Sequence, residues 1–380
     1  MTNTTIKLAV VTQFPKDPNY PYGGVEAVSV NLVKSLSEIE DLDIHVITQD
    51  KEITDPTLDD WNNVTIHRLP RSSNNEIINA VFTGKKLISS YIQRLNPDII
   101  HAHDTYGIMV SDLDYPRAFT VHGFIYGDTL LSQKKLPWLR SKIWKYVEQN
   151  GWSKQEHIIS ISPYVRERVS QVSSAVIHDI DNPISESFFN IRNSANDANI
   201  FSAAVISPRK NTLNLILAVE TLIKEGYDLQ LRLAGSVSNE EYGNLVQRTI
   251  KEKNLENNVK LLGRINSTEI KDELSKATIF ALVSLEENSP MGIEEAMAAG
   301  IPVVTSNMCG MPYMVKDGES GYLVNPHDIS DISRRFKRIL TDKNLSGSMR
   351  EKSIQIAQDR FHPKVVANKT YQVYRDILNL

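Results

Sequence analysis

The chain has 380 residues, a length that exceeds a single ordinary core and predicts two domains of roughly 150 to 200 residues each. The formal net charge of −4 argues against a general nucleic-acid binder, because such proteins carry basic surfaces. Cys309 is the only cysteine, which excludes an intrachain disulfide framework and a cysteine-based zinc site. We therefore expect a cytoplasmic protein.

Short apolar runs alternate with helical patterns along the chain, which predicts parallel α/β sheets. Lys7 lies within the first run and no small-residue cleavage site follows it, so we expect a first strand and not a signal peptide. The expected strands are residues 6–12, 43–48, 64–69, 98–103, 117–122, 156–162, 200–206, 229–235, 259–264, 279–283 and 301–305. The expected helices include residues 25–36, 76–95, 212–224, 290–299 and 361–380.

Polar residues follow several of these strands, where open α/β sheets bind their ligands. Gly23 and Gly24 deliver a helix N-terminus after the first strand, and glycines let a backbone approach a ligand closely. His103 and His122 end two neighbouring strands. A histidine at a strand end is commonly a hydrogen-bonded structural residue, but two that point into one crevice favour a site, with His122 preferred.

Residues 131–151 alternate lysine and arginine with tryptophan, leucine and isoleucine, a basic amphipathic pattern. The pattern predicts peripheral contact with an anionic membrane or approach to a lipid-linked acceptor. The alternative is an ordinary domain helix whose apolar side chains face the sheet while its lysines face water.

The second half places charged residues in two strand-to-helix loops. Arg209 and Lys210 follow strand 200–206, where cations could neutralise a diphosphate. Glu287 lies in the loop after strand 279–283, and Ser289 with Pro290 predicts an N-cap and a first helical residue. This helix start suits an anion, and carboxylates beside it suit the hydroxyls of a ribose or hexose. The alternative is that the acids only favour the helix dipole or are solvated.

Glu287 and Glu295, followed by AMAAGIPVVTS, resemble the signature of family 4 retaining glycosyltransferases of the GT-B fold. The resemblance extends over nearly the whole chain. It implies two Rossmann-like parallel-sheet domains that face each other across a cleft. Residues 1–184 would bind the acceptor, residues 185–360 would bind the nucleotide sugar, and the helix at 361–380 would cross back to the first domain.

The resemblance also implies roles for individual residues. Glu295 would hold the nucleotide ribose, Glu287 would contact the donor sugar, and Lys210 would bind the diphosphate. His122 would lie near the reacting sugar, so the expected catalytic residues are His122, Glu287 and Lys210. The expected donor-binding residues are Gly23, Gly24, Arg209, Lys210, Gly235, Leu262, Gly263, Arg264, Glu287, Asn288, Ser289, Pro290, Met291, Gly292 and Glu295.

The implied activity is retaining transfer of a hexose-type sugar from a UDP-, GDP- or ADP-sugar to a glycan, lipid-linked or small-molecule acceptor. Such transfer serves polysaccharide or glycoconjugate biosynthesis in the cytoplasm or at the inner face of the membrane. We expect no cofactor, no metal and no nucleic-acid partner. The Asp-x-Asp strings at 41–43, 112–114 and 179–181 are typical of turns.

Two positions depart from the family pattern. Val205 occupies the position of a diphosphate-binding arginine, and Tyr313 replaces a common glutamate. These changes keep two other interpretations open: a donor-binding but catalytically impaired partner subunit, and a nucleotide-sugar epimerase of the same fold.

Overall fold

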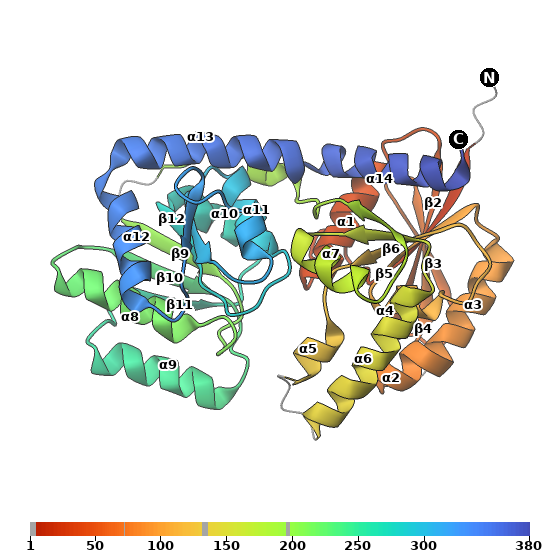
Figure 1. Ribbon diagram of the computed structural model, residues 1–380, viewed down its shortest axis with the longest axis horizontal. Helices are drawn as coiled ribbons and strands as arrows, with labels where there is room; N and C mark the ends of the chain where they lie inside the picture. The colour runs from red at the N-terminus through yellow and green to blue at the C-terminus, as the bar shows by residue number, and fades with distance from the viewer. Residues whose placement is uncertain (1–4, 72, 131–135, 195–197) are drawn as a thin grey trace. The chain divides into compact units, whose positions relative to one another are not determined.

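The computed structural model describes residues 5–71, 73–130, 136–194 and 198–380 (Figure 1). It divides into two units, one formed by Met1–Pro183 with Pro363–Leu380 and the other by Ile184–His362. Each unit contains one sheet with helices on both faces, so the predicted α/β class with two parallel-sheet domains is confirmed. Among the described helices, none is long and apolar enough to cross a membrane.

The first sheet has the strand order β3-β4-β2-β1-β5-β6-β7-β8. Its strands are β1 (Ile6–Val11), β2 (Leu42–Asp50), β3 (Thr57–Trp61), β4 (Val64–Pro70), β5 (Ile99–His103), β6 (Arg117–Val121), β7 (His157–Ser160) and β8 (Val176–Asp179). All pairings are parallel except that of β3 with β4. The edge strand β3 was not predicted, because its mostly exposed residues carry no apolar run.

The helices of the first unit are α1 (Gly24–Leu36), α2 (Glu76–Ile78), α3 (Gly84–Leu95), α4 (Thr105–Met109), α5 (Ile125–Leu130), α6 (Pro137–Ser153), α7 (Pro163–Ser170) and α14 (Pro363–Leu378). The single helix expected at 76–95 is instead interrupted by a π-helical turn, Asn79–Thr83. Such turns are not visible in a hydrophobic pattern, since they insert one residue without changing its character.

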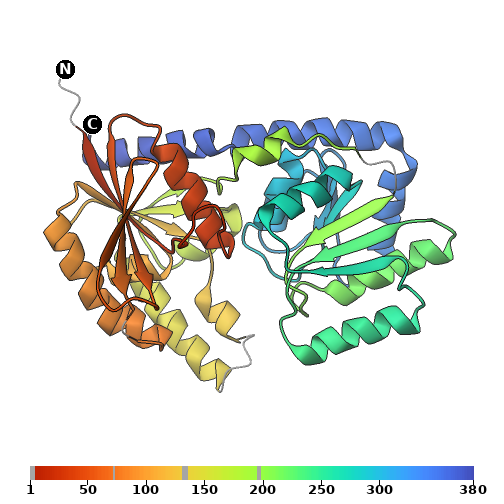
Figure 2. The same cartoon turned by 180° about the vertical axis from the view of Figure 1, so that it is seen from behind.

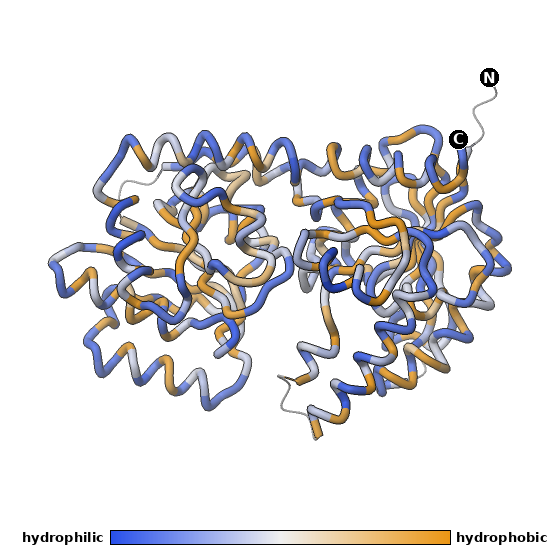
Figure 3. The backbone as a smooth tube through the Cα atoms, viewed as in Figure 1, coloured by the Kyte–Doolittle hydropathy of each residue, from blue (hydrophilic) through white to orange (hydrophobic). Residues whose placement is uncertain are grey.

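Alternate residues of each strand supply two separate cores on the two faces of the first sheet. Leu8 and Val10 of β1 pack with α1 and α14 on one face. Ala9 and Val11 pack with α3, α4 and α6 on the other. Because both faces are covered, the central strands are largely apolar, and Figure 3 shows hydrophobic segments within this sheet.

A buried histidine ties the C-terminal helix α14 to the first sheet. The Nδ1 atom of His101 on β5 lies 2.6 Å from the Tyr374 hydroxyl of α14, and its Nε2 atom lies 2.7 Å from Thr120 Oγ1. Tyr374 is fully buried in the core shared with α1. The predicted return of the C-terminal helix to the first unit is therefore confirmed.

The second sheet has the order β11-β10-β9-β12-β13-β14, with every pairing parallel. Its strands are β9 (Asn199–Ala203), β10 (Gln230–Ala234), β11 (Val259–Gly263), β12 (Ile279–Leu282), β13 (Val303–Ser306) and β14 (Gly321–Val324). Its helices are α8 (Thr212–Lys224), α9 (Glu240–Glu252), α10 (Ser267–Lys276), α11 (Met291–Ala298), α12 (Ile329–Thr341) and α13 (Lys343–Arg360), with 3₁₀ turns at Glu186–Asn190 and Met311–Tyr313.

The second sheet is also covered on both faces, as the reverse view in Figure 2 helps to follow. Ile200 and Leu231 pack with α8, α9 and α12 on one face. Phe201 and Phe280 pack with α10, α11 and α13 on the other. This arrangement holds the strand ends rigidly and leaves the loops at their carboxyl edge to carry function.

We expect His101 to make the first unit less stable in acid. Burial lowers the pKa of His101 to about 3, whereas an unfolded histidine titrates near 6.5. The unfolded state therefore binds the proton first, and stability falls as the pH drops below about 6.5 toward 3. Between pH 7 and 5 this residue should account for about 2 kcal/mol.

Urea denaturation followed by tryptophan fluorescence checks this, since all 4 tryptophans lie in the first unit. A His101→Gln variant should lose about 2 kcal/mol less than the wild type between the two pH values. The exposed His327→Gln variant, in the second unit, serves as the control and should match the wild type. A His101→Gln variant that loses as much unfolding free energy as the wild type between pH 7 and pH 5 contradicts the assignment.

Candidate functional site

The second sheet has its topological switch point between β9 and β12. These neighbouring strands pair in parallel, and the chain leaves them toward opposite edges of the sheet. Open α/β sheets bind ligands at such a point, beyond the carboxyl ends of the strands. The loops that follow β9 and β12 contain Lys210 and Glu287, two of the predicted catalytic residues.

The two loops are joined by charged side chains and by the backbone. Lys210 Nζ forms an ion pair with Glu287 Oε1, and both side chains are largely buried, at 14% and 10% exposure. Arg209 Nη1 donates to the Glu286 carbonyl at 2.9 Å and lies 3.7 Å from Glu287 Oε1. The Leu285 N–H donates to the Arg209 carbonyl at 2.8 Å. Two cations and one carboxylate are thus fixed at the switch point.

The helix after β12 begins one residue later than predicted. Pro290 occupies the N-cap position and Met291 is the first helical residue of α11. The prediction of Ser289 as N-cap was wrong, because its hydroxyl donates to Glu294 Oε1 at 2.8 Å instead of accepting from the helix backbone. Pro290 has no side-chain acceptor with which to cap α11, and the first N–H groups of a helix suit an anion.

Glu295 lies in α11 with its side chain half-buried. Burial raises the pKa of this carboxyl group to about 8. It contrasts with its neighbour Glu294, which is fully buried and accepts the Ser289 hydroxyl. Of the two adjacent acids, Glu294 supports the loop, whereas Glu295 keeps accessible surface for a ligand.

The loop after β13 also packs against the Glu287 segment. The Gly310 N–H donates to the Glu287 carbonyl at 2.8 Å. A Cβ atom at position 310 would lie 1.8 Å from the Asn288 carbonyl oxygen, so only glycine fits. Because Gly310 has no side chain, its backbone can lie directly against the backbone of Asn288. This contact holds the half-buried Asn288 in place.

The predicted residues at the carboxyl ends of β10 and β11 meet each other at the same edge of the sheet. Gly235 donates its N–H to the Gly263 carbonyl at 2.8 Å. Gly235 has a φ of +148°, and a Cβ there would lie 2.0 Å from the Ala204 carbonyl oxygen. Leu262 is half-buried and Arg264 is exposed. The loops after β9, β10 and β11 are thereby linked.

The two departures from the family pattern are both exposed. Val205 follows β9 in the loop that contains Arg209, and Tyr313 lies in the 3₁₀ turn after β13. The Tyr313 carbonyl accepts from Arg360 Nη1 at 2.8 Å. Neither side chain supports the core, so neither change has a packing cost.

The predicted residues of the first unit lie in two places. Gly23 is the N-cap of α1 and Gly24 its first residue, both exposed. His122 follows β6, and its Nε2 lies 2.8 Å from His103 Nδ1, while its ring also hydrogen-bonds to the Asn182 side chain. Burial lowers the pKa of His122. The adjoining cavity of about 10 Å³ is no larger than one water requires.

The side chains of helix α6 distinguish between the two interpretations of residues 131–151. Residues 131–135 of this segment lie outside the described residues. Trp144 and Trp152 are buried against the sheet, as an ordinary domain helix requires. Trp138, Leu139 and Ile143 are instead exposed, at 53%, 40% and 41%. The alternative of an ordinary domain helix therefore fits Trp144 and Trp152, but it does not fit the exposed Trp138 and Leu139.

Sequence reasoning missed a group of residues around a cavity in the first unit. Lys51 and Arg71 follow β2 and β4, and both line a cavity of about 720 Å³. Their position directly after parallel strands is the signal that could have identified them.

Two family models match the chain in succession. The model described as Glycosyltransferase Family 4 matches residues 22–188, and the model described as Glycosyl transferases group 1 matches residues 184–359. The chain belongs to the family 4 glycosyltransferases. The activity class predicted from Glu287, Glu295 and the segment that follows them is thereby confirmed.

This family 4 glycosyltransferase matches similar proteins over nearly the full length of both chains. It is 26% identical over 370 residues to the UDP-Gal:alpha-D-GlcNAc-diphosphoundecaprenol alpha-1,3-galactosyltransferase of Escherichia coli, with 91% of this chain and 90% of that protein covered. The solved sucrose-phosphate synthase of Thermosynechococcus elongatus matches with a TM-score of 0.83 at 18% identity, over 98% of this chain and 99% of that one.

A second solved structure is Anabaena HepE in complex with UDP and glucose. It matches the family 4 chain with a TM-score of 0.72 at 17% identity, over 97% of this chain and 99% of that one. At identities of 18% and 17%, a structural match shows the fold alone. Both structures support the GT-B fold of this family.

Proposed function

We propose that the chain is a retaining glycosyltransferase that moves a hexose-type sugar from a nucleoside-diphosphate sugar to a glycan, lipid-linked or small-molecule acceptor. One observation carries the proposal: Lys210, Arg209 and Glu287 converge at the switch point of the second sheet. The E. coli relative is named for its use of UDP-Gal, and the structurally similar HepE was solved with UDP and glucose, which supports a nucleotide-sugar donor.

The diphosphate is the leaving group and gains negative charge as the sugar departs. Lys210 and Arg209 provide positive charge for it, and the uncapped start of α11 adds backbone N–H groups at Met291 and Gly292. Preorganised donors of this kind stabilise the transition state without rearrangement. In this proposal the protein's own cations balance the leaving group, with no metal.

The carboxyl groups of Glu295 and Glu287 form hydrogen bonds with the hydroxyl groups of the donor. Glu295 has a pKa of about 8, so near neutral pH it is mostly protonated and can both donate and accept hydrogen bonds. That capacity suits the adjacent hydroxyls of a ribose. Glu287, held by Lys210, is placed to accept from the donor sugar.

Arg209 favours an active enzyme over an impaired partner subunit. The family arginine is absent at Val205, but the Arg209 guanidinium lies 3.7 Å from the Glu287 carboxylate in the same loop cluster. We propose that Arg209 replaces the missing cation. Analysis of products without any acceptor separates this activity from epimerisation, which needs no acceptor, and the anomeric coupling constant of the product tests retention.

We expect Glu295→Ala to weaken nucleotide binding by about 10- to 100-fold, the range for loss of two hydrogen bonds of about 0.5 to 1.5 kcal/mol each. Lys210→Ala should reduce turnover by about 100- to 1000-fold, with a smaller effect on binding, because it acts on charge that develops in the transition state. A thermal-shift screen of UDP-, GDP- and ADP-sugars identifies the donor, and calorimetry and turnover assays then measure both effects.

The exposed Glu256→Ala and Lys251→Ala variants of the second unit are the matched controls and should behave like the wild type. Melting temperatures separate loss of function from loss of folding, which matters because Lys210→Ala leaves Glu287 without its nearest cation. Unchanged nucleotide affinity in a folded Glu295→Ala variant would contradict the proposed donor site.

We also propose that the outer face of α6 contacts an anionic membrane at its cytoplasmic side. The apolar residues Trp138, Leu139 and Ile143 are exposed there, and Lys142 Nζ lies 5.6 Å from the centre of the Trp138 ring. The only acid of α6, Glu148, is buried and accepts the N–H groups of Ile125 and Tyr126. The exposed face thus combines apolar residues with positive charge alone, as interfacial helices do.

We expect the protein to sediment with vesicles that contain phosphatidylglycerol, and binding to weaken as salt is added. A Trp138→Ser/Ile143→Ser double variant should bind at least about tenfold more weakly, since it removes the exposed apolar groups. Leu58→Ser, which changes an exposed apolar residue on β3, is the control. Protein that stays in solution with anionic vesicles at low salt would rule out this contact.

A further inference from the structure

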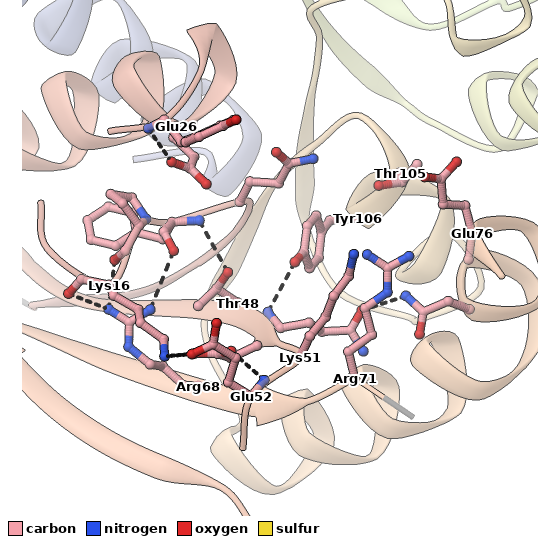
Figure 4. Close-up of a pocket in the computed structure, with 18 of the residues that line it drawn as sticks. Lys16, Glu26, Thr48, Lys51, Glu52, Arg68, Arg71, Glu76, Thr105 and Tyr106 are labelled. Carbon is pink, nitrogen blue, oxygen red and sulfur yellow. Dashed lines mark hydrogen bonds and ion pairs between the residues drawn. The ribbon is translucent and has the colours of Figure 1, made fainter. Parts of the chain in front are cut away.

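The first unit contains a cavity of about 720 Å³ that the donor site does not use (Figure 4). It lies beyond the carboxyl ends of β1, β2 and β4, beside the start of α4. Its volume is within the range of about 300 to 1000 Å³ that is typical of small-molecule sites. The charged side chains around it indicate what kind of molecule it takes.

Two of the cations that line the cavity are already neutralised. Arg68 is buried, with its Nε atom 2.7 Å from Asp59 Oδ2 and its Nη2 atom 2.8 Å from the Pro15 carbonyl oxygen. Lys16 forms an ion pair with Glu52 and lies 3.7 Å from Asp50. Neither is available to a ligand without breaking an existing contact.

The other two cations, Lys51 and Arg71, are placed side by side by the sheet. Asp50 of β2 pairs with Pro70 of β4 in parallel register, so the residues that follow them are neighbours. Figure 4 shows both side chains reaching from the strand ends toward Tyr106. Among the described residues, no carboxylate forms an ion pair with either. The guanidinium of Arg71 donates its Nε–H to the Ser73 carbonyl at 3.1 Å.

Most acids around the cavity are engaged by the backbone. Asp17 Oδ1 accepts the Asn19 N–H at 2.9 Å, Asp50 Oδ1 accepts the Glu52 N–H at 2.8 Å, and Glu26 Oε2 accepts the Tyr22 N–H at 2.7 Å. Glu76 lies in the first turn of α2, where a carboxylate favours the helix dipole. These carboxylates keep their charge, but among the described residues none of them forms an ion pair with Lys51 or Arg71. Two like charges side by side favour an anion between them.

Polar groups suited to a sugar lie beside this pair. The Tyr106 hydroxyl accepts the Gln49 N–H at 3.0 Å, and Thr105 lies next to it at the start of α4. Figure 4 shows Tyr106 beside Lys51 and Arg71, with its hydroxyl directed at the end of β2. Hydroxyl groups fixed in this way can order the ring of a bound sugar.

We propose that this cavity binds the acceptor through an anionic substituent, a carboxylate or a phosphate on a sugar, held by Lys51 and Arg71. The inference rests on the proposed glycosyl transfer and adds the chemical class of the acceptor. The guanidinium of Arg71 matches two oxygens of either anion, and the ammonium of Lys51 adds a second charge.

Three sugars test the proposal on the full chain: methyl α-glucuronide, glucose 1-phosphate and the neutral methyl α-glucoside. Dissociation constants come from ligand-observed NMR titrations at low salt. At least one anionic sugar should bind about tenfold or more tightly than the neutral one. Preference for the glucuronide alone identifies a carboxylate, and preference for the phosphate alone identifies a phosphate.

The Lys51→Gln/Arg71→Gln double variant should abolish the preference, whereas Lys51→Arg/Arg71→Lys, which keeps both charges, should retain it. Lys86→Gln/Arg94→Gln, on the exposed surface of α3, makes the same charge change elsewhere and should have no effect. Melting temperatures verify folding. Equal affinity for the three sugars, or a preference that survives in the folded Gln double variant, overturns the inference.

UDP binding by the same samples reports on the donor site separately. UDP that binds the wild type and the variants alike, without any preference among the sugars, overturns the acceptor inference alone. Failure of UDP and of the other nucleoside diphosphates to bind the wild type would instead overturn the proposed transfer.

Discussion

The ion pair between Lys210 and Glu287 is the interaction on which the donor site depends. It joins the loops after β9 and β12, the two strands that flank the switch point of the second sheet. Both side chains are largely buried, and removing one member of such a pair costs about 3 to 5 kcal/mol, because the other charge is left uncompensated. The pair therefore holds the cation and the carboxylate in position before any ligand arrives, and Gly310 closes a further loop onto the same segment.

Both units place charged residues at the carboxyl edge of a buried sheet, but the two sets of residues suit different ligands. In each, strands buried on both faces fix the loops at the carboxyl edge, and charged residues gather where neighbouring strands end. In the second unit the cations are matched with a carboxylate, which suits a donor with both phosphates and hydroxyls. In the described part of the first unit, no carboxylate forms an ion pair with Lys51 or Arg71. The difference in charge balance distinguishes the two proposed ligands.

The sequence predicted what depends on local pattern and missed what depends on tertiary contacts. Apolar runs predict most of the buried strands but not β14, and the acids and cations that follow β9 and β12 can be recognised without knowledge of their contacts. The Ser289 cap failed because the hydroxyl found Glu294, a partner that local propensity does not reveal. The outward orientation of Trp138 was left open, because packing alone decides which side of a helix is exposed. The adjacent Lys51 and Arg71 were missed, because the register of β2 and β4 that brings them together is set by tertiary structure.

Hydrogen exchange with and without UDP, followed by mass spectrometry, tests the donor site most directly. The account predicts slower exchange on UDP binding in residues 204–211, 284–292 and 307–311, the loops that meet at Lys210 and Glu287, with little change at β3 in the first unit. Slowed exchange confined to the first unit, or saturating UDP binding that leaves these three loops unchanged, would contradict it.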